Sequence, residues 1–256
     1  MNKKMVFLDP VLNPVLQPLL NASPFWGIFV MAFVITLLIT IAYKFFTNQT
    51  EMKRLKDQQK EYQKKMKELK SNPPEMMKVQ KEAMKLNMQY MKQSFKVTFI
   101  TFIPIILIFG WMSAHLAYEP VYPGERFGVT GIFAEGVTGD AELLVDKGTE
   151  LLSDANQPIN SEVTWNLKSD EGPHIFTIKT SNDEQSKKVL ITKELKYEEA
   201  VAFFEHTDIE QIKINYKKLK PLGKQSLFGW QPGWLGIYII LSIVFSIGLR
   251  KILKIY

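Results

Sequence analysis

The sequence predicts an α-helical membrane protein. We expect three transmembrane helices, a cytoplasmic helical hairpin (a coiled coil) between the first two, and a small extracytoplasmic β-rich domain between the second and third. Three observations predict this fold: three long uncharged runs, a basic segment with heptad spacing after the first run, and alternating apolar residues after the second. The 256 residues carry a net charge of +6 and no cysteine, so no disulfide is expected.

The three uncharged runs cover residues 24–43, 97–118 and 227–249. Each is near or above the ~20 apolar residues that cross a bilayer as a helix. A buried helix of a soluble protein is the alternative for one run, but three such runs in one chain argue against it. We therefore predict membrane spans at 24–46, 97–118 and 227–249.

The first 23 residues have some features of a signal peptide, because Lys3 and Lys4 precede an apolar stretch. Asp9 and three prolines interrupt that stretch, so we expect no clean hydrophobic helix there. We predict that 1–23 is an outer interfacial segment whose apolar side chains dip into the bilayer surface. The side chains expected to do so are Val6, Phe7, Leu8, Leu12 and Leu16.

Charge predicts the orientation. Residues 44–96 hold fourteen Lys and Arg against six Asp and Glu, so the segment 47–96 and the tail 250–256 should be cytoplasmic. The N-terminus and residues 119–226 then lie outside, in a multi-pass protein of the cell membrane. One cluster opposes this orientation: Lys213, Lys217, Lys218, Lys220 and Lys224. Long segments translocate largely regardless of charge, so the cluster does not reverse the prediction.

The cytoplasmic segment has the pattern of two helical arms. In the first arm, residues at 3–4 spacing predict a packing seam. Asn72 is expected to cap the second arm, with Pro73 at its first position and Glu75 completing a capping box. The seam positions are Met52, Leu55, Gln59, Tyr62, Met66 and Leu69, and the second arm repeats the spacing at Met77, Met84, Met88, Met91 and Phe95.

Methionines are concentrated in this hairpin, which holds seven of the eleven. Methionine is flexible and specifies packing weakly, but it adapts to varied apolar partners. We favour hairpin packing for Met52 and Met66. We favour a substrate-binding surface for Met76, Met77, Met84, Met88 and Met91. The excess lysines keep the helices solvated, bind anionic lipid, or contact ribosomal RNA; the sequence does not separate these roles.

The spans contain no ionisable group at depth, which argues against ion-coupled transporters and proton pumps. Hydroxyl pairs remain, each on one face of its helix. One interpretation is ordinary contact between helices. The other is a partly polar groove, which is favoured because all the pairs fall in the predicted cytoplasmic half. The pairs are Thr36 and Thr40, Thr98 and Thr101, and Ser242 and Ser246. Pro104 is expected to kink the second span.

The sequence of residues 119–226 predicts a compact antiparallel β domain, a sandwich, with one short helix near 197–206. The Gly-rich stretch 124–139 is either a strand or a loop along the membrane. We find no catalytic constellation, no metal-ligand pattern and no phosphate-binding loop, and therefore expect neither an enzyme nor a cofactor. Ser113 and His115 face different directions without an acid, and His174 and His206 are far apart.

Residues 46–112, which include "KELKSNPPEMMKVQKEAMKLNMQYMKQSFK", resemble the archaeal YidC-like proteins of the YidC/Oxa/Alb insertase superfamily. The C-terminal "GWLGIYIILSIVFSIGLRKIL" resembles the end of that family. The resemblance implies a three-helix core, an outer N-terminus and a cytoplasmic coiled coil. It also implies transfer of nascent chains from the ribosome through a groove open to cytosol and lipid, and a second small membrane subunit. Bacterial members hold an arginine in the groove, whereas no predicted span here contains one.

The predicted function is therefore a membrane-protein insertase or chaperone that receives nascent hydrophobic segments and passes them into the bilayer. Two alternatives from other classes remain open. One is an oligomeric ion channel or leak pathway. The other is a non-catalytic membrane scaffold or receptor that uses the β domain.

Overall fold

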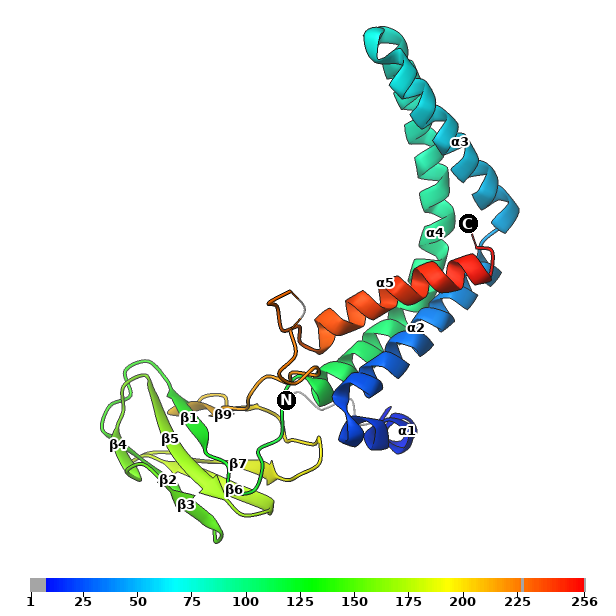
Figure 1. The fold of residues 1–256 in the computed structure, drawn as a ribbon. Helices are drawn as coiled ribbons and strands as arrows, with labels where there is room; N and C mark the ends of the chain where they lie inside the picture. Colours follow the sequence, from blue (N-terminus) through cyan, green and yellow to red (C-terminus); the bar gives the residue numbers. More distant parts are fainter. Residues whose placement is uncertain (1–7, 227, 256) are drawn as a thin grey trace. The chain divides into compact units, whose positions relative to one another are not determined.

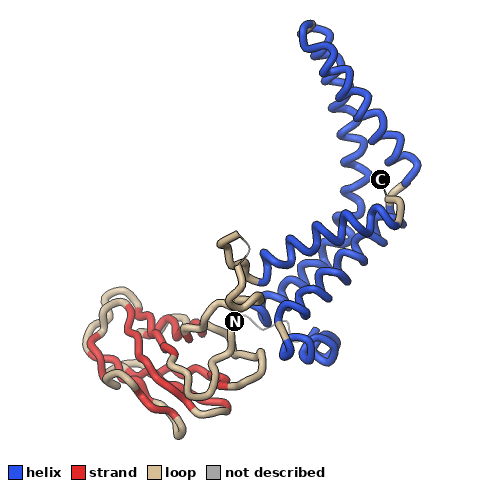
Figure 2. Tube along the Cα trace, in the orientation of Figure 1, coloured by secondary structure: helices blue, strands red, loops and turns tan. Residues whose placement is uncertain are grey.

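The computed structural model describes residues 8–226 and 228–255. The chain forms two compact units, each built from two stretches of sequence. One unit, residues 28–109 and 236–256, is helical. The other, residues 1–27 and 110–235, contains the β-strands (Figures 1 and 2). Each is described by itself.

Three helices in the described residues are long and apolar enough to cross a membrane: α2 (Pro24–Phe46), α4 (Pro73–Leu116) and α5 (Trp234–Ile252). The predicted return arm and second span are thus one helix, α4, which continues through Pro104. The third helix begins at Trp234 and not at 227. Gly229, Pro232 and Gly233 explain the difference, because glycine and proline disfavour a helix interior.

The first arm of the predicted hairpin is α3 (Gln49–Glu68), which ends in the short 3-10 helix η2 (Leu69–Ser71). Asn48 caps α3, since its side chain accepts a hydrogen bond from the amide of Glu51 at 3.1 Å. Gln59 of α3 donates to Asn87 of α4 across 3.3 Å. The positions of the predicted seam are all buried or half-buried, five in α3 and the last in η2: Met52, Leu55, Gln59, Tyr62, Met66 and Leu69.

The base of the hairpin packs against the C-terminal residues. Met52 and Val97 are buried with Tyr43 and Ile255 in one apolar cluster. The tail turns back after α5, and the amide of Ile255 donates to the carbonyl of Arg250 at 2.9 Å. The end of α5 is therefore fixed to the base of α3 and α4 by buried apolar area.

The other unit contains a two-sheet antiparallel β-sandwich, whose five-stranded sheet has the order β3-β5-β1-β9-β8 and whose four-stranded sheet has the order β4-β2-β6-β7. Strand β1, which pairs with both β5 and β9, lies in the Gly-rich stretch that the sequence left as strand or loop. The strands are β1 (Phe127–Phe133), β2 (Asp140–Leu144), β3 (Thr149–Leu151), β4 (Asn156–Pro158), β5 (Glu162–Ser169), β6 (Gly172–Lys179), β7 (Glu184–Ile191), β8 (Val201–Phe203) and β9 (Ile209–Ile214).

The sandwich core follows from alternation along the strands. In β5, Val163, Trp165 and Leu167 point inward, as their spacing predicts. The Trp165 ring is fully buried, and its indole nitrogen donates to the carbonyl of Ala155 at 2.9 Å. The buried polar atom is thereby satisfied, which burial of a tryptophan requires.

The prediction of a short helix near 197–206 is wrong. Residues 197–200 have no regular structure, and Val201–Phe203 form the edge strand β8. Strand β8 pairs with β9, and Tyr197 is buried in the sandwich core. Burial raises the pKa of the Tyr197 hydroxyl to about 12. Pairing and burial in the sandwich outweigh the local helix propensity of the sequence.

The segment predicted to lie at the bilayer surface contains the helix α1 (Asp9–Ala22). Its prolines are four residues apart, so the hydrogen bonds that they remove lie along one side, and that side is exposed. Leu16, predicted to face the bilayer, is instead 3% exposed. The outward apolar face consists of Pro10, Val11, Pro14, Val15 and Pro18, and Val6 and Phe7 lie outside the described residues.

A pair formed by the buried His174 and the half-buried Asp146 holds the loop before β3 to β6. His174 Nδ1 lies 2.8 Å from Asp146 Oδ1, and the amide of Ile175 donates to Asp146 Oδ2 at 3.0 Å. Burial acts to raise the pKa of the Asp146 carboxyl, but the hydrogen bonds from His174 and Ile175 outweigh it and lower that pKa. The stabilising contribution of Asp146 is thus present above the ordinary aspartate pKa and is lost as pH falls through the lowered one.

Replacing Asp146 with asparagine is expected to destabilise this region by about 1–3 kcal/mol, because His174 loses a charged partner. Hydrogen exchange of the full-length protein in micelles should show faster exchange in residues 172–179 at neutral pH. The difference from the wild type should shrink as the pH falls. The exposed Asp154→Asn variant removes one charge from the same unit and serves as the control; equal exchange in the two variants would refute the role of Asp146.

Candidate functional site

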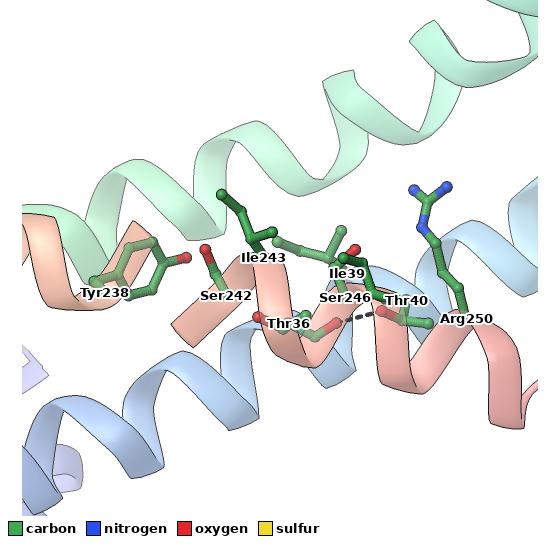
Figure 3. A pocket seen from close by; sticks show the side chains of 9 residues that line it. Thr36, Ile39, Thr40, Tyr238, Ser242, Ile243, Ser246 and Arg250 are labelled. Atoms are coloured by element: carbon green, nitrogen blue, oxygen red, sulfur yellow. Dashed lines mark hydrogen bonds between the residues drawn. The ribbon is translucent and has the colours of Figure 1, made fainter. Parts of the chain in front are cut away.

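A groove of about 360 Å³ lies between α2 and α5 (Figure 3). One turn of α2 and four successive turns of α5 line it. On α5, polar side chains recur every fourth residue, so they form a stripe about 18 Å long on one helix face. The lining residues are Thr36, Ile39 and Thr40 from α2, and Tyr238, Ser242, Ile243, Ser246, Ile247 and Arg250 from α5.

Two hydroxyls of the groove are held by their own helices. Thr40 Oγ1 donates to the carbonyl of Thr36 at 2.6 Å, and Ser242 Oγ donates to that of Ile239 at 2.9 Å. A hydroxyl that has donated its proton still has lone pairs free to accept. The groove therefore offers acceptor atoms to a polar group without leaving buried donors unsatisfied in the apolar surroundings.

One end of the groove carries a positive charge. The guanidinium carbon of Arg250 lies 4.8 Å from the centre of the Tyr43 ring, and the Tyr43 hydroxyl lies 2.9 Å from Ser94 Oγ on α4. Side chains of α2, α4 and α5 thus meet at this end. In residues 8–226 and 228–255, no carboxylate forms an ion pair with Arg250. The cation remains available to an anionic group that enters the groove.

Sequence reasoning missed two of these residues. The sequence predicts that Arg250 lies just beyond the third span, whereas α5 extends to Ile252 and places Arg250 in its last turn. Tyr238 was not considered because it stands alone in an apolar run. The i, i+4 repeat that joins Tyr238, Ser242, Ser246 and Arg250 was the signal that could have found both.

Of the three predicted hydroxyl pairs, the structure brings two together in the groove, those of α2 and α5. Thr98 and Thr101 of α4 are not among the lining residues. Thr98 is exposed and donates to the carbonyl of Ser94 at 3.2 Å, and Thr101 donates to that of Val97 at 2.9 Å. Their hydroxyls serve their own helix, because the buried side of α4 here is that of Val97.

The methionines of α4 divide between two faces. Met76 is half-buried, on the same face as the half-buried Val79, Ala83, Leu86 and Tyr90. The other four are exposed, by 68%, 65%, 62% and 39% in chain order. We call these four residues the methionine stripe: Met77, Met84, Met88 and Met91. Phe95 and Phe99, also exposed, continue the stripe along α4 toward the span.

Within the described residues, no group of three or more His, Cys, Asp or Glu is arranged to hold a metal ion. His115 lies 3.3 Å from Asp9 of α1 and stacks on Trp111, while His174 pairs with Asp146. Both histidines thus bridge elements of the unit that contains the sandwich. Each has a structural partner that the sequence spacing does not reveal.

Three apolar helices and a groove between two of them define an integral, multi-pass membrane protein. Residues 9–136, half of the chain, match the family described as integral membrane protein EMC3/TMCO1-like. The chain belongs to this family, which is part of the Oxa1/YidC/Alb3 insertase superfamily. Comparison with curated proteins and with solved structures found no match.

Proposed function

We propose that this protein is a membrane-protein insertase, an archaeal YidC-like member of the superfamily. It receives hydrophobic segments of nascent chains from the ribosome and passes them into the cell membrane. The observation that carries the proposal is the groove between α2 and α5, which combines five hydroxyls with Arg250 at one end. Within the described residues, Arg250 forms no ion pair with a carboxylate. Membership in an insertase superfamily supports it.

The proposed orientation follows the distribution of charge. The coiled-coil hairpin of α3 and α4 and the C-terminal residues lie in the cytoplasm, and the N-terminus and the β-sandwich lie outside. Under this orientation the Arg250 end of the groove faces the cytoplasm, because α5 ends there with Arg250 and Lys251. The apolar outer face of α1 then rests on the outer surface of the bilayer.

The proposed reaction path has three steps, none of which needs a nucleotide, a metal or a covalent intermediate. The methionine stripe first binds an apolar segment as it leaves the ribosome. A polar terminus of the substrate then enters the groove, where hydroxyls and Arg250 replace part of its hydration and lower the cost of its transfer. Burial of the segment's own apolar area in lipid drives its release. A second small membrane subunit completes the open side of the groove.

Site-specific photo-crosslinking to stalled ribosome–nascent-chain complexes tests this proposal. Probes at Met84 and Met88 should crosslink to chains that carry a transmembrane segment and not to soluble chains. Probes at Val79 and Leu86, half-buried on the other face of the same helix, are matched controls and should crosslink far less. Probes at Thr40 and Ser246 should capture the substrate at a later stage. Crosslinks confined to the hairpin itself would instead assign the methionines to packing and refute the capture step.

A further inference from the structure

The segment between the sandwich and α5 is held at both of its ends beside membrane helices. Before it, the amide of Leu219 donates to the carbonyl of Ala117 at 3.1 Å, and that of Glu119 donates to Lys217 at 2.8 Å. Ala117 and Glu119 come just after Leu116, the last residue of α4. After it, α5 begins at Trp234. We call residues 220–226 and 228–233 the aromatic loop; it starts beside residues that follow α4 and ends at the first residue of α5.

The aromatic loop presents large apolar side chains to solvent. The Phe228 ring is fully exposed and Trp230 is 55% exposed. The loop is nevertheless structured by turns, since the amide of Gly223 donates to Lys220 at 2.8 Å and that of Gln225 to Leu222 at 3.1 Å. Exposed aromatic rings that follow these turns mark an interaction surface, and Trp and Tyr are enriched where a membrane meets water.

The positive charge of the aromatic loop indicates that its partner is an anionic bilayer. Residues 211–234 contain five lysines and no acidic residue, although residues 119–226 as a whole carry a net negative charge. Lys217 pairs with Glu125, whereas Lys220 and Lys224 are exposed within the aromatic loop. Lysines beside exposed aromatic rings match the phosphates and acyl boundary of an anionic bilayer. Residues 119–226 as a whole would be repelled by an anionic bilayer because their net charge is negative. The lysines of the aromatic loop supply positive charge next to the bilayer.

The chain length allows the rings to reach the bilayer. Trp230 precedes Trp234 by four residues, which span at most about 14 Å when fully extended. Each polar interfacial layer of a bilayer is about 5–8 Å thick. A tryptophan tied so closely to the first residue of a membrane helix remains within reach of the headgroups.

We propose that the aromatic loop is a membrane-surface anchor. Phe228 and Trp230 insert at the boundary between headgroups and acyl chains, and Lys220 and Lys224 bind the phosphates of anionic lipids. This inference rests on the membrane helices and not on insertase activity. The anchor restrains the connection between the sandwich and α5 at the bilayer surface.

Depth-dependent quenching in proteoliposomes tests the anchor. The chain has no cysteine, so a single one can be introduced and labelled with an environment-sensitive fluorophore. Ser226→Cys places the label in the aromatic loop, and Ser181→Cys places it in the exposed turn between β6 and β7 as the control. The full-length protein is reconstituted in equal parts of phosphatidylcholine and phosphatidylglycerol, with a nitroxide quencher on the acyl chain near the headgroup.

We expect strong quenching of the label at 226 and none at 181. Phe228→Ser combined with Trp230→Ser should abolish the quenching, and Lys220→Gln combined with Lys224→Gln should lower it by about half or more. Pure phosphatidylcholine should have the same effect as removing the lysines. A label at 226 that is as water-exposed as the one at 181 would overturn the anchor. Quenching that ignores both the lysines and the anionic lipid would overturn the phosphate contacts.

Discussion

Replacing the whole methionine stripe with serine is expected to reduce capture of nascent hydrophobic segments at least about tenfold. Full burial of one methionine side chain contributes about 1.5–3 kcal/mol, and 1.4 kcal/mol corresponds to a factor of ten. Losing part of this burial free energy at four positions weakens binding by more than the ~1.4 kcal/mol that corresponds to a factor of ten. The substitutions are Met77→Ser, Met84→Ser, Met88→Ser and Met91→Ser, and crosslinking yield to stalled nascent chains measures the loss.

The same four positions replaced with leucine form the matched control. Leucine keeps the apolar area and the helix propensity but loses the flexibility of the thioether chain. This variant should keep capture of one good substrate and narrow the range of substrates captured. Serine variants that capture as well as the wild type, while remaining helical by circular dichroism, would exclude the stripe as the capture surface.

Reversing the charge at Arg250 is expected to have the second large effect, a loss of insertion. Arg250→Glu is expected to lower insertion of substrates with acidic termini at least about tenfold, because attraction across a partly desolvated groove becomes repulsion. Substrates with neutral termini should insert almost normally. Protease protection of the translocated terminus in proteoliposomes measures both classes of substrate.

The neighbouring residue offers a control for net charge. Lys251 is exposed and does not line the groove, so Lys251→Glu makes the same charge change a short distance away. Arg250→Lys should retain a substantial part of the activity, since it keeps the charge but loses the planar stacking on Tyr43. If Arg250→Glu and Lys251→Glu behave alike, the groove charge has no specific role.

The sequence predicted the helices well, because uncharged runs and heptad spacing are properties of the chain itself. It predicted the faces less well. Met77, Met84 and Met88 share helical spacing with one another, but so do Val79 and Leu86 on another face. Two apolar faces on one helix leave the choice of the packed face to the partner helix. In the structure the face with Val79 and Leu86 is the half-buried one, and the methionine stripe is exposed.

The misplaced residues have comparable physical causes. Thr98 was assigned to the groove by its depth in the span, but depth does not fix rotation about the helix axis. The sequence predicts that the charged Arg250 lies beyond the third span, whereas α5 continues to Ile252 and the Arg250 side chain reaches the Tyr43 ring of α2. The sequence predicts a helix where β8 forms, because the strand β9 that pairs with β8 comes later in the chain and leaves no local pattern of a strand at β8.

Helix α4 is continuous from the tip of the hairpin through the span, but it changes direction where the arm meets the span (Figure 1). At 1.5 Å per residue its 44 residues follow an axis about 66 Å long. Pro104, inside the span, leaves the carbonyl of Ile100 without its usual donor. At the base of the arm, Tyr43, Met52 and Val97 are buried in one apolar cluster, and the Tyr43 hydroxyl lies 2.9 Å from Ser94 Oγ of α4. A change in the direction of the arm would therefore disturb the contacts of Tyr43, the residue on which Arg250 stacks at the charged end of the groove.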